Sequence, residues 1–476
     1  MRRGHAGDFE RTSLLIPAPG VCGGDYNHDV PGARRKPASA EAALLALLLA
    51  ACGGTSPSTT VPDTPEPTPS PTPAGPPNIV LVVADDLGFG DLSSYGSPVI
   101  KTPNLDRLAA EGVRFTQFTV PAPICAPSRA AILTGRYPVR TGIHWNPPGH
   151  LRPKELTLGD LFRERGYATG MVGKWHLGFE DEDLPVYHGF DFYYGLPFGE
   201  DPNDFYLGAT ITTDTVGFDL VARKYTEEAV SFMRSAQARP FFLYLAHRSP
   251  HTPLYASDQF LGRSQGGLYG DVVEELDFQV GELVRAVKEL GLERNTLVVF
   301  TSDNGPSRQK GEFGSAGPFL GGKGSCLEGG VRVPGIVWWP GRIPGGRVST
   351  EAVSTLDLVP TFLSAAKAPL PEGRVYDGVD LMPLLTGAVS RLGGPGEGGG
   401  RELVHYFSSD AVALRSGRYK YLRPGFWDSA TGLYDLEADP GEAHNLFVEQ
   451  KELAQRLESR LAFLADLIAT ESPLPR

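Results

Sequence analysis

The stretch Asn78-Ile79-Val80-Leu81-Val82-Val83-Ala84, followed directly by Asp85-Asp86, indicates the kind of fold. A continuous apolar run rich in β-branched residues is typical of a parallel strand covered on both faces. Parallel sheets bind ligands outside the carboxyl ends of their strands. The two carboxylates therefore stand where a functional site would form.

Beyond this stretch, candidate strands and helices alternate. Further strands are expected at 168–172, 241–246, 296–301 and 335–339, and helices at 104–111, 156–165, 226–235, 271–290 and 355–366. Ser354 and Asp357 have the spacing of a capping box for the last of these helices. The alternation predicts an α/β fold, with a large, mainly parallel (mixed) central sheet sandwiched by helices.

The C-terminal part has a different pattern. After the glycine-rich residues 393–400, four short segments bounded by turns predict a small antiparallel sheet. A final amphipathic helix carries a stripe that is interpreted as a packing face, made of Leu453, Leu457, Leu461, Leu464 and Leu467. We expect a main α/β domain over 78–392 and a C-terminal α+β subdomain over 393–476.

The N-terminal residues resemble an export signal. Arg34-Arg35-Lys36 precedes a short apolar run that ends in Leu49-Ala50-Ala51-Cys52, which resembles a bacterial lipobox. Residues 1–52 are predicted to be a leader and lipoprotein-type signal peptide, with Cys52 attached to a membrane through lipid. An ordinary cleaved signal peptide is the alternative. Residues 53–77, rich in Pro, Thr and Ser, should form a tether. The expectation is an exported bacterial protein, periplasmic or at the cell surface.

Charge and cysteine content narrow the function further. The net charge is −12 and no basic stripe is present, which argues against a nucleic-acid partner. The chain has four cysteines, Cys22, Cys52, Cys125 and Cys326. If the first is lost with the leader, the second is lipidated and the third is modified, only Cys326 remains. No intrachain disulfide is then expected.

The stretch from Cys125 to Arg136 predicts a short helix with a reactive residue at its start. Pro127 suits a first turn and Gly135 is a natural stop, so Cys125 lies where free N–H groups and the helix dipole favour an anion. Arg129 follows one turn later, on the same side. A passive buried cysteine and a thiolate nucleophile are the two readings that the residues alone leave open.

Oxygen-bearing side chains follow two predicted strands. Asp85 and Asp86 come after the first strand, and Asp303 and Asn304 come after the strand at 296–301. Each pair alone could be a turn or a helix cap. Together at neighbouring strand ends they would suit a hard divalent cation, Ca²⁺ or Mg²⁺, better than zinc.

Basic side chains follow the other predicted strands. Lys174 and His176 lie two residues apart, so both should point to one side of an extended segment. His251 follows the strand at 241–246, and His247 is interpreted as structural. Lys323 lies in a glycine-rich loop that permits close approach to an anion.

Several of these motifs resemble those of type I sulfatases in the alkaline phosphatase-like superfamily. The match covers Cys125 to Arg136, Gly173-Lys174-Trp175-His176-Leu177-Gly178 and Leu433-Tyr434-Asp435-Leu436, within a region from about Asn78 to Leu446. It is closest to enzymes of the arylsulfatase and N-acetylgalactosamine-6-sulfatase kind. The resemblance implies that Cys125 is oxidised to Cα-formylglycine by a formylglycine-generating or anaerobic sulfatase-maturating enzyme.

The resemblance also implies a role for each site residue. One divalent ion per chain would be held by Asp85, Asp86, residue 125, Asp303 and Asn304. Arg129, Lys174 and Lys323 would place positive charge on the sulfate. His251, with Lys323, would assist the leaving oxygen, and His176 would act as base or relay.

The predicted function is hydrolysis of an aryl or carbohydrate sulfate ester to alcohol and inorganic sulfate. The alternatives are a phosphatase or phosphonate monoester hydrolase of the same superfamily, and a non-catalytic lipoprotein that binds sulfated glycans. Specificity is expected in the loops 180–215 and 307–319. Six aromatic residues there could stack on a sugar, about half of them being core in any fold: Tyr187, Phe192, Tyr193, Tyr194, Phe205 and Tyr206.

Overall fold

The computed structural model describes residues 75–471, apart from 148, 153, 179, 198–204, 213–215, 308–313, 426, 427 and 429. The predicted leader, the lipidation site at Cys52 and nearly all of the tether lie outside these residues. Among the helices that the structure describes, none combines the length and the apolar character needed to cross a bilayer.

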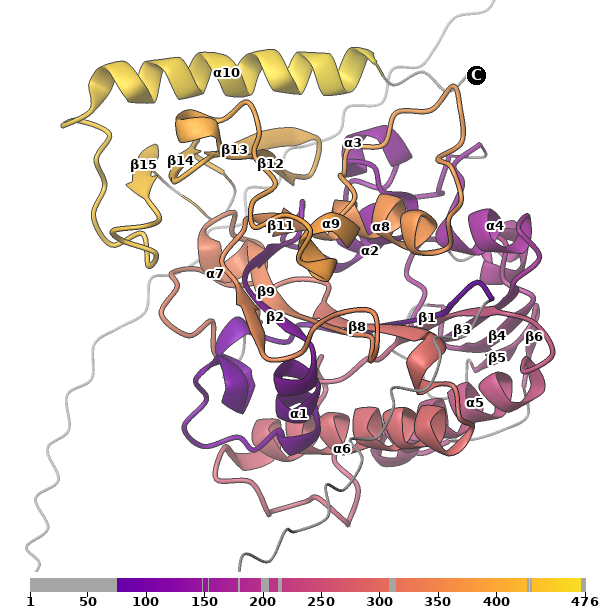
Figure 1. Cartoon of the computed structure of the whole chain (residues 1–476). Coiled ribbons are helices and arrows are strands. Elements are labelled where there is room, and N and C mark those ends of the chain that lie inside the picture. Colours follow the sequence, from indigo (N-terminus) through magenta and orange to yellow (C-terminus); the bar gives the residue numbers. More distant parts are fainter. Residues whose placement is uncertain are drawn as a thin grey trace, which may run out of the picture. The chain divides into compact units, whose positions relative to one another are not determined.

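A large mixed sheet forms the centre of the main domain (Figure 1). Its strand order is β10-β2-β9-β8-β1-β7-β3-β4-β5-β6, with β11 paired to β2. The central strand β1 is parallel to both of its neighbours, whereas β9 is antiparallel to β8 and to β2. The predicted fold class is therefore confirmed. The strands are β1 (Asn78–Ala84), β2 (Val113–Thr119), β3 (Ala168–Gly173), β4 (Phe192–Gly195), β5 (Tyr206–Leu207), β6 (Thr210–Ile211), β7 (Phe241–Ala246), β8 (Thr296–Ser302), β9 (Arg332–Trp338), β10 (Arg347–Ser349) and β11 (Val353–Ser354).

Helices cover both faces of this sheet (Figure 1). One face carries α1 (Pro103–Glu111), α5 (Val221–Ser235) and α6 (Gly267–Glu289), and the other carries α2 (Cys125–Thr134), α4 (Leu158–Arg163), α8 (Leu358–Ala365) and α9 (Met382–Thr386). Two short helices, α3 (Pro138–Thr141) and α7 (Glu328–Val331), lie in connections. Along β1, Ile79, Leu81 and Val83 pack into one core cluster, and Val80 and Val82 pack into the other. The strand is covered on both faces, as its continuous apolar run predicts.

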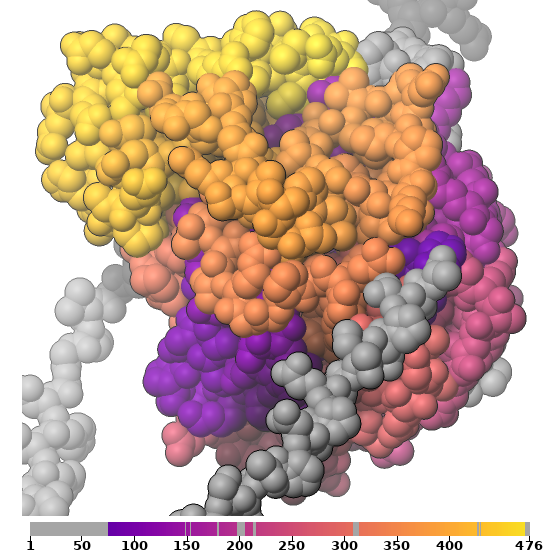
Figure 2. Space-filling model, in the orientation of Figure 1, coloured from indigo at the N-terminus to yellow at the C-terminus, as the bar shows by residue number. Residues whose placement is uncertain are grey.

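A second, antiparallel sheet follows the main domain. It has the order β12-β13-β14-β15 and is followed by the predicted C-terminal helix, α10. Leu453, Leu457 and Leu461 of α10 are buried against the sheet in a cluster that also contains Ala131 of α2. In Figure 2 these C-terminal residues, orange and yellow, form one continuous area of the surface. The elements are β12 (Glu402–Phe407), β13 (Asp410–Ser416), β14 (Tyr419–Leu422), β15 (Gly432–Asp435) and α10 (Lys451–Thr470).

Candidate active site

The acidic pairs meet because their strands are neighbours. Strands β1 and β8 run parallel, with Ala84 opposite Ser302, so the residues that follow leave the sheet side by side. The Asp86 N–H donates to Asp303 Oδ1 at 3.1 Å, and Asn304 Nδ2 donates to Asp86 Oδ1 at 2.7 Å. Asp85 is also buried. Asp86 has φ 64°, a left-handed backbone that a non-glycine residue adopts at a cost of about 1 kcal/mol.

Cys125 reaches this acidic cluster from the first residue of α2. Its Sγ lies 3.4 Å from Asp85 Oδ1 and 3.7 Å from Asp86 Oδ1. Ligand atoms of these three residues and of His251 all lie within 4.8 Å of one another. The predicted short helix is confirmed, and Gly135 ends it with φ 67°. Cys125 and Cys326 are both free thiols in the described part of the chain.

Three basic side chains surround the carboxylates. Lys174 Nζ lies 2.6 Å from Asp85 Oδ2, and Lys323 Nζ lies 2.7 Å from Asp86 Oδ2. Arg129 Nη2 lies 2.8 Å from Asp303 Oδ2 and 3.4 Å from Asp85 Oδ2. Three cations thus balance three carboxylates. A divalent ion added to this cluster would leave two positive charges available to an anionic substrate.

The pKa values show how strongly this cluster favours particular charge states. Burial opposes ionisation of Asp85, yet Lys174 and neighbouring basic groups hold its pKa well below the usual range. Burial and the charge of Asp85 raise the pKa of Asp303 to about 7. Burial, reinforced by both aspartates, raises the pKa of the Cys125 thiol well above its ordinary value. An unmodified Cys125 is therefore held as the neutral thiol, which is a poor nucleophile.

The donor set fits a hard divalent cation. Asn304 Oδ1 is buried and has no hydrogen-bond partner in the described residues, and it is joined by the carboxylates of Asp85, Asp86 and Asp303. Oxygen donors of this kind suit Ca²⁺ or Mg²⁺. The Sγ of Cys125 does not suit such an ion, whereas oxygen atoms on a modified residue 125 would.

Two histidines lie beside the cluster. His251 Nε2 lies 3.7 Å from Asp86 Oδ2, while its Nδ1 lies 2.6 Å from the Thr252 carbonyl and is assigned as the donor to it. Burial lowers the pKa of His251. Burial, then the charges of Lys174 and Arg129, place the pKa of His176 well below its ordinary value. Both imidazoles are thus favoured in the neutral form.

The expected extended geometry of Lys174 and His176 was wrong. Strand β3 ends at Gly173, and His176 has φ 61°, so the alternation of a strand does not extend to it. The loop nevertheless brings both residues within electrostatic reach of Asp85. His247 is fully buried, and neither ring nitrogen has a hydrogen-bond partner in the described residues, so its structural role stays a prediction.

Sequence reasoning missed Asn146. Its Oδ1 accepts a hydrogen bond of 2.9 Å from the N–H of Ala126, next to Cys125. The contact satisfies one of the free donors at the start of α2 and ties that end of the helix to the loop after α3. Asn146-Pro147 has the composition of an ordinary turn, so no local signal separates this role from a turn residue.

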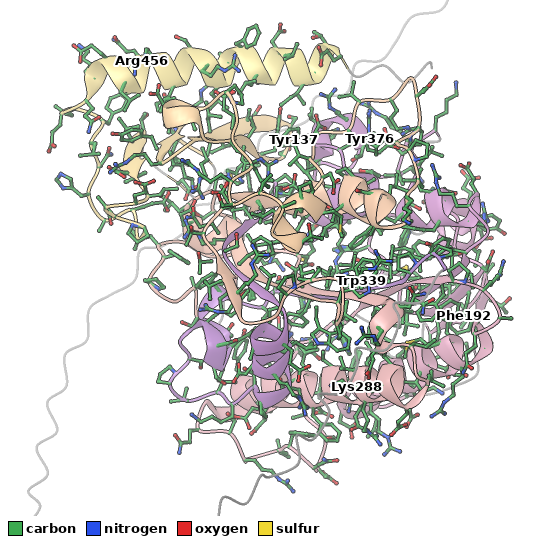
Figure 3. All side chains as sticks on the ribbon, in the orientation of Figure 1. Tyr137, Phe192, Lys288, Trp339, Tyr376 and Arg456 are labelled. Atoms are coloured by element: carbon green, nitrogen blue, oxygen red, sulfur yellow. The ribbon has the colours of Figure 1, made fainter. Side chains whose placement is uncertain are left out.

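Half of the six predicted stacking aromatics are core residues, which was the expected share. Tyr193, Tyr194 and Phe205 are buried. Phe192, labelled in Figure 3, stacks on Phe232 of α5 with ring centroids 5.7 Å apart. Tyr187 is 58% exposed and remains open to a ligand.

Comparison with known proteins identifies two matching family profiles. The profile described as Sulfatase matches residues 77–368, and the profile described as N-sulphoglucosamine sulphohydrolase, C-terminal, matches residues 322–466. The N-acetylgalactosamine-6-sulfatase of Canis lupus familiaris is 42% identical over 382 residues, which are 72% of this chain and 71% of that protein. Arylsulfatase A of Bos taurus is 40% identical over 445 residues, 80% of this chain and 85% of that protein.

A solved structure shows the same likeness. The crystal structure of Ps i-CgsB in complex with k-i-k-neocarrahexaose superposes with a TM-score of 0.74 at 32% identity. The alignment covers 84% of this chain and 94% of that one.

Proposed function

Because the chain belongs to the sulfatase family and is a sulfuric ester hydrolase, we propose that it acts through a Cα-formylglycine made from Cys125 and through one divalent ion. The single observation that carries this proposal is the position of Cys125. Its Sγ lies within 3.7 Å of two aspartates at the start of a helix, and burial with Asp303 and Asp85 raises the pKa of its thiol well above the ordinary value.

The ion would be held by five groups at neighbouring strand and helix ends. They are the oxygens of Asp85, Asp86, Asp303, Asn304 and the modified residue 125. Such an ion supplies charge neutralisation and alignment for attack on sulfur. We propose Ca²⁺, with Mg²⁺ as the alternative, because flexible carboxylate and amide oxygen sets favour the larger ion.

A hydrated aldehyde at residue 125 offers one hydroxyl to attack sulfur and a second hydroxyl whose proton can be removed to expel sulfate. Lys174 and Arg129 are placed to orient the acidic groups beneath that hydrate, since they contact Asp85. His176 lies on the same side and is the proposed base or relay for the second hydroxyl, because burial keeps its imidazole neutral.

Departure of the organic group requires a proton or a positive charge at the leaving oxygen. His251 Nε2 and Lys323 Nζ both lie beside Asp86 Oδ2, at 3.7 and 2.7 Å, on the side of the cluster that retains some exposure. We assign to these two residues the role of stabilising the leaving oxygen. The Thr252 carbonyl fixes the ring of His251 by accepting from Nδ1, so Nε2 faces the substrate. Nε2 donates to the leaving oxygen only when the imidazole has taken up a second proton, whereas Lys323 supplies positive charge there without that step.

The substrate class and the location of the protein in the cell are proposed from the sequence motifs. We propose a carbohydrate sulfate, acted on by an exported enzyme that is attached to a membrane through lipid at Cys52. Maturation would need a formylglycine-generating or anaerobic sulfatase-maturating enzyme. Support for the carbohydrate comes from relatives that are named for sugar sulfates and from a similar structure that holds a carrageenan oligosaccharide.

Two measurements test the proposal. Mass spectrometry of the peptide that contains residue 125 should show an aldehyde in active protein, whereas an unmodified thiol in fully active protein would contradict it. A paired assay of 4-nitrophenyl sulfate and 4-nitrophenyl phosphate should give the larger kcat/KM for the sulfate. A larger value for the phosphate would favour the phosphatase alternative.

A further inference from the structure

A second cavity lies apart from the active site, between the edge of the main sheet and the C-terminal sheet. Its volume is about 700 Å³, within the range of small-molecule binding sites. None of its lining residues belongs to the acidic cluster or to the basic groups around it. Its walls come from β2, the start of β9, the segment after β10, residues 390–401, the end of β13 with the turn that follows it, and the segment after β15.

Five arginines and three glutamates (Glu351, Glu397 and Glu437) line this cavity, and four of the arginines have a carboxylate partner. The pairs are Arg332 with Glu328, Arg391 with Glu351, Arg401 with Asp357, and Arg418 with Asp435.

Arg415 is the exception. Its Nη2 donates to Gln117 Oε1 and its Nε donates to the Gly417 carbonyl at 3.1 Å, so both acceptors are neutral. Its Nη1 is buried and has no hydrogen-bond partner among the described residues. Within the described part of the chain, no carboxylate forms a salt bridge with Arg415.

A buried guanidinium without a counter-ion is unfavourable. The Arg415 residue is 4% exposed, and a guanidinium does not deprotonate at physiological pH. Burial lowers the pKa of Arg415 to about 10, although Glu328, Glu351 and Glu437 act in the opposite direction. Each of these carboxylates is paired with another cation, Glu328 with Arg332, Glu351 with Arg391 and Glu437 with Arg418, so Arg415 has no ion-pair partner of its own among the described residues.

We propose that this cavity is a second anion site, which binds a sulfate group through Arg415. A cavity of 700 Å³ is far larger than the ~30 Å³ that one water molecule occupies, so it has room for a sugar ring as well as its sulfate. Hydroxyl side chains suited to a saccharide line the opening, at Thr116, Thr350 and Ser390. The ligand class is a sulfated saccharide, with free inorganic sulfate as the minimal form of the same chemistry.

Binding by the full, metal-loaded protein tests this site, with sucrose octasulfate and sodium sulfate as separate probes in titration calorimetry. Arg415→Gln removes the guanidinium charge, and Thr350→Glu places a negative charge at the exposed rim without changing Arg415. Each variant should weaken binding of sucrose octasulfate at this site about tenfold, which is the effect of losing one charged hydrogen bond. Ser459→Glu, an exposed change on α10, is the matched control and should bind as wild type does.

Wild type and the three variants have the same active site. Anion binding at the active site therefore contributes equally to all four titrations, and differences between them report on the cavity. Turnover of 4-nitrophenyl sulfate should be unchanged in each variant. If binding of sodium sulfate is weakened in parallel, a lone oxyanion is enough to fill the site. If only binding of sucrose octasulfate is weakened, the saccharide is required. Equal binding of both probes to wild type and to Thr350→Glu would overturn the proposal, whether or not Arg415→Gln folds.

Discussion

The thiol of Cys125 has no exposed surface, and burial, reinforced by the charges of Asp303 and Asp85, raises its pKa and favours the protonated form. Ordinary cysteine chemistry is therefore suppressed at the position where the sequence motif requires a nucleophile. A modified residue with two geminal hydroxyls resolves this conflict, because it needs no thiolate and presents oxygen to a hard cation. The two Cys125 partners and the family motif thus point to the same chemistry.

Replacing Cys125 by serine should leave a hydroxyl that can attack sulfur once but has no second hydroxyl to expel the product. We expect Cys125→Ser to lower kcat by at least about a thousandfold. Steady-state assays with an aryl sulfate measure this loss, and intact-mass analysis would show any sulfated enzyme that accumulates. Cys326→Ser is the matched control, because Cys326 is also buried but touches none of the site carboxylates. Full turnover by Cys125→Ser would rule out the aldehyde mechanism.

His247 should make the protein sensitive to acid. Burial lowers the pKa of His247 to about 4, whereas in the unfolded chain it titrates near 6.5. Between these pH values the unfolded chain binds a proton at His247 that the folded chain does not bind. The free energy of unfolding therefore falls as the pH drops from 6.5 towards 4, and above pH 6.5 His247 causes no such loss.

His247→Phe should remove this part of the acid sensitivity, and it breaks no hydrogen bond to the described residues, among which neither ring nitrogen has a partner. Wild type and variant should both be compared by the free energy of unfolding that they lose between pH 7.5 and pH 4.5. We expect this loss to be about 1–3 kcal/mol smaller in the variant. Urea unfolding at the two pH values measures the difference. His444→Gln, at an exposed histidine, should change neither value. An unchanged pH slope in His247→Phe would show that His247 titrates normally in the folded protein.

At the scale of elements, helix α2 sets the position of Cys125, and Gly135 sets the end of α2. Gly135 has φ 67°, and a Cβ there would lie 2.8 Å from the Cβ of Val359. The C-terminal sheet also holds this helix in place. Tyr137, labelled in Figure 3, packs against Tyr406 with ring centroids 5.4 Å apart and accepts a hydrogen bond from the Val404 N–H.

Gly135→Ala should destabilise the protein by more than Gly166→Ala does. Gly166 has φ 79° with open space around it, so its substitution reports only the backbone cost, about 1 kcal/mol. Gly135→Ala adds a clash with Val359, and we expect about 2–4 kcal/mol in total. It should also lower kcat by moving Cys125, while Gly166→Ala should not. Urea denaturation and aryl sulfate assays measure the two effects, and equal destabilisation by both variants would contradict the clash.

The sequence predicts the buried strands well and the half-buried ones poorly. β1 and β7 have their expected bounds, because a continuous apolar run has one stable environment in an α/β fold. β2 was not predicted, since its half-buried positions carry Arg114, Thr116 and Gln117 and only a partner strand distinguishes it from a loop. The helix expected at 226–235 begins at Val221, five residues earlier, because its first turn adds only two buried side chains to the periodic pattern.

The candidate site was predictable as a set of residues but not as a set of contacts. Asp85 and Asp303 each follow an apolar run, which predicted that both lie at the carboxyl edge of a parallel sheet. The parallel pairing of β1 with β8 places both at that edge. The contacts of Lys174 with Asp85 and of Lys323 with Asp86 depend on loops whose conformations, like the positive φ of His176, have no local signal. Asn146 was missed for the same reason.

At the scale of the whole molecule, a buried ionic cluster connects the two sheets. Lys420 of β14 lies 2.8 Å from Glu328 of α7 and 3.0 Å from Glu442, and none of the three side chains is exposed. Helix α7 follows the loop that carries Lys323, so the C-terminal sheet holds the base of that loop.

Lys420→Met should be strongly destabilising, because it leaves the buried Glu442 without a cation and leaves Glu328 with Arg332 alone. We expect a loss of about 3–5 kcal/mol in the free energy of unfolding, measured by urea denaturation. Lys451→Met, at an exposed position on α10, should have little effect. Adding Glu442→Gln to Lys420→Met should recover part of the loss, because Glu328 keeps its pair with Arg332. No recovery would mean that the apolar stem of Lys420, and not its charge, stabilises this contact.

The complete burial of Cys125 also sets a chronology for the newly made polypeptide. The oxidising enzyme proposed above would have to reach the sulfur of Cys125, and in the finished protein that sulfur lies buried in the first turn of α2. On this proposal, oxidation has to precede the closing of the fold. Each molecule would then have one early interval in which it can be made active, and a copy that folds first would be excluded from that step for as long as it stays native.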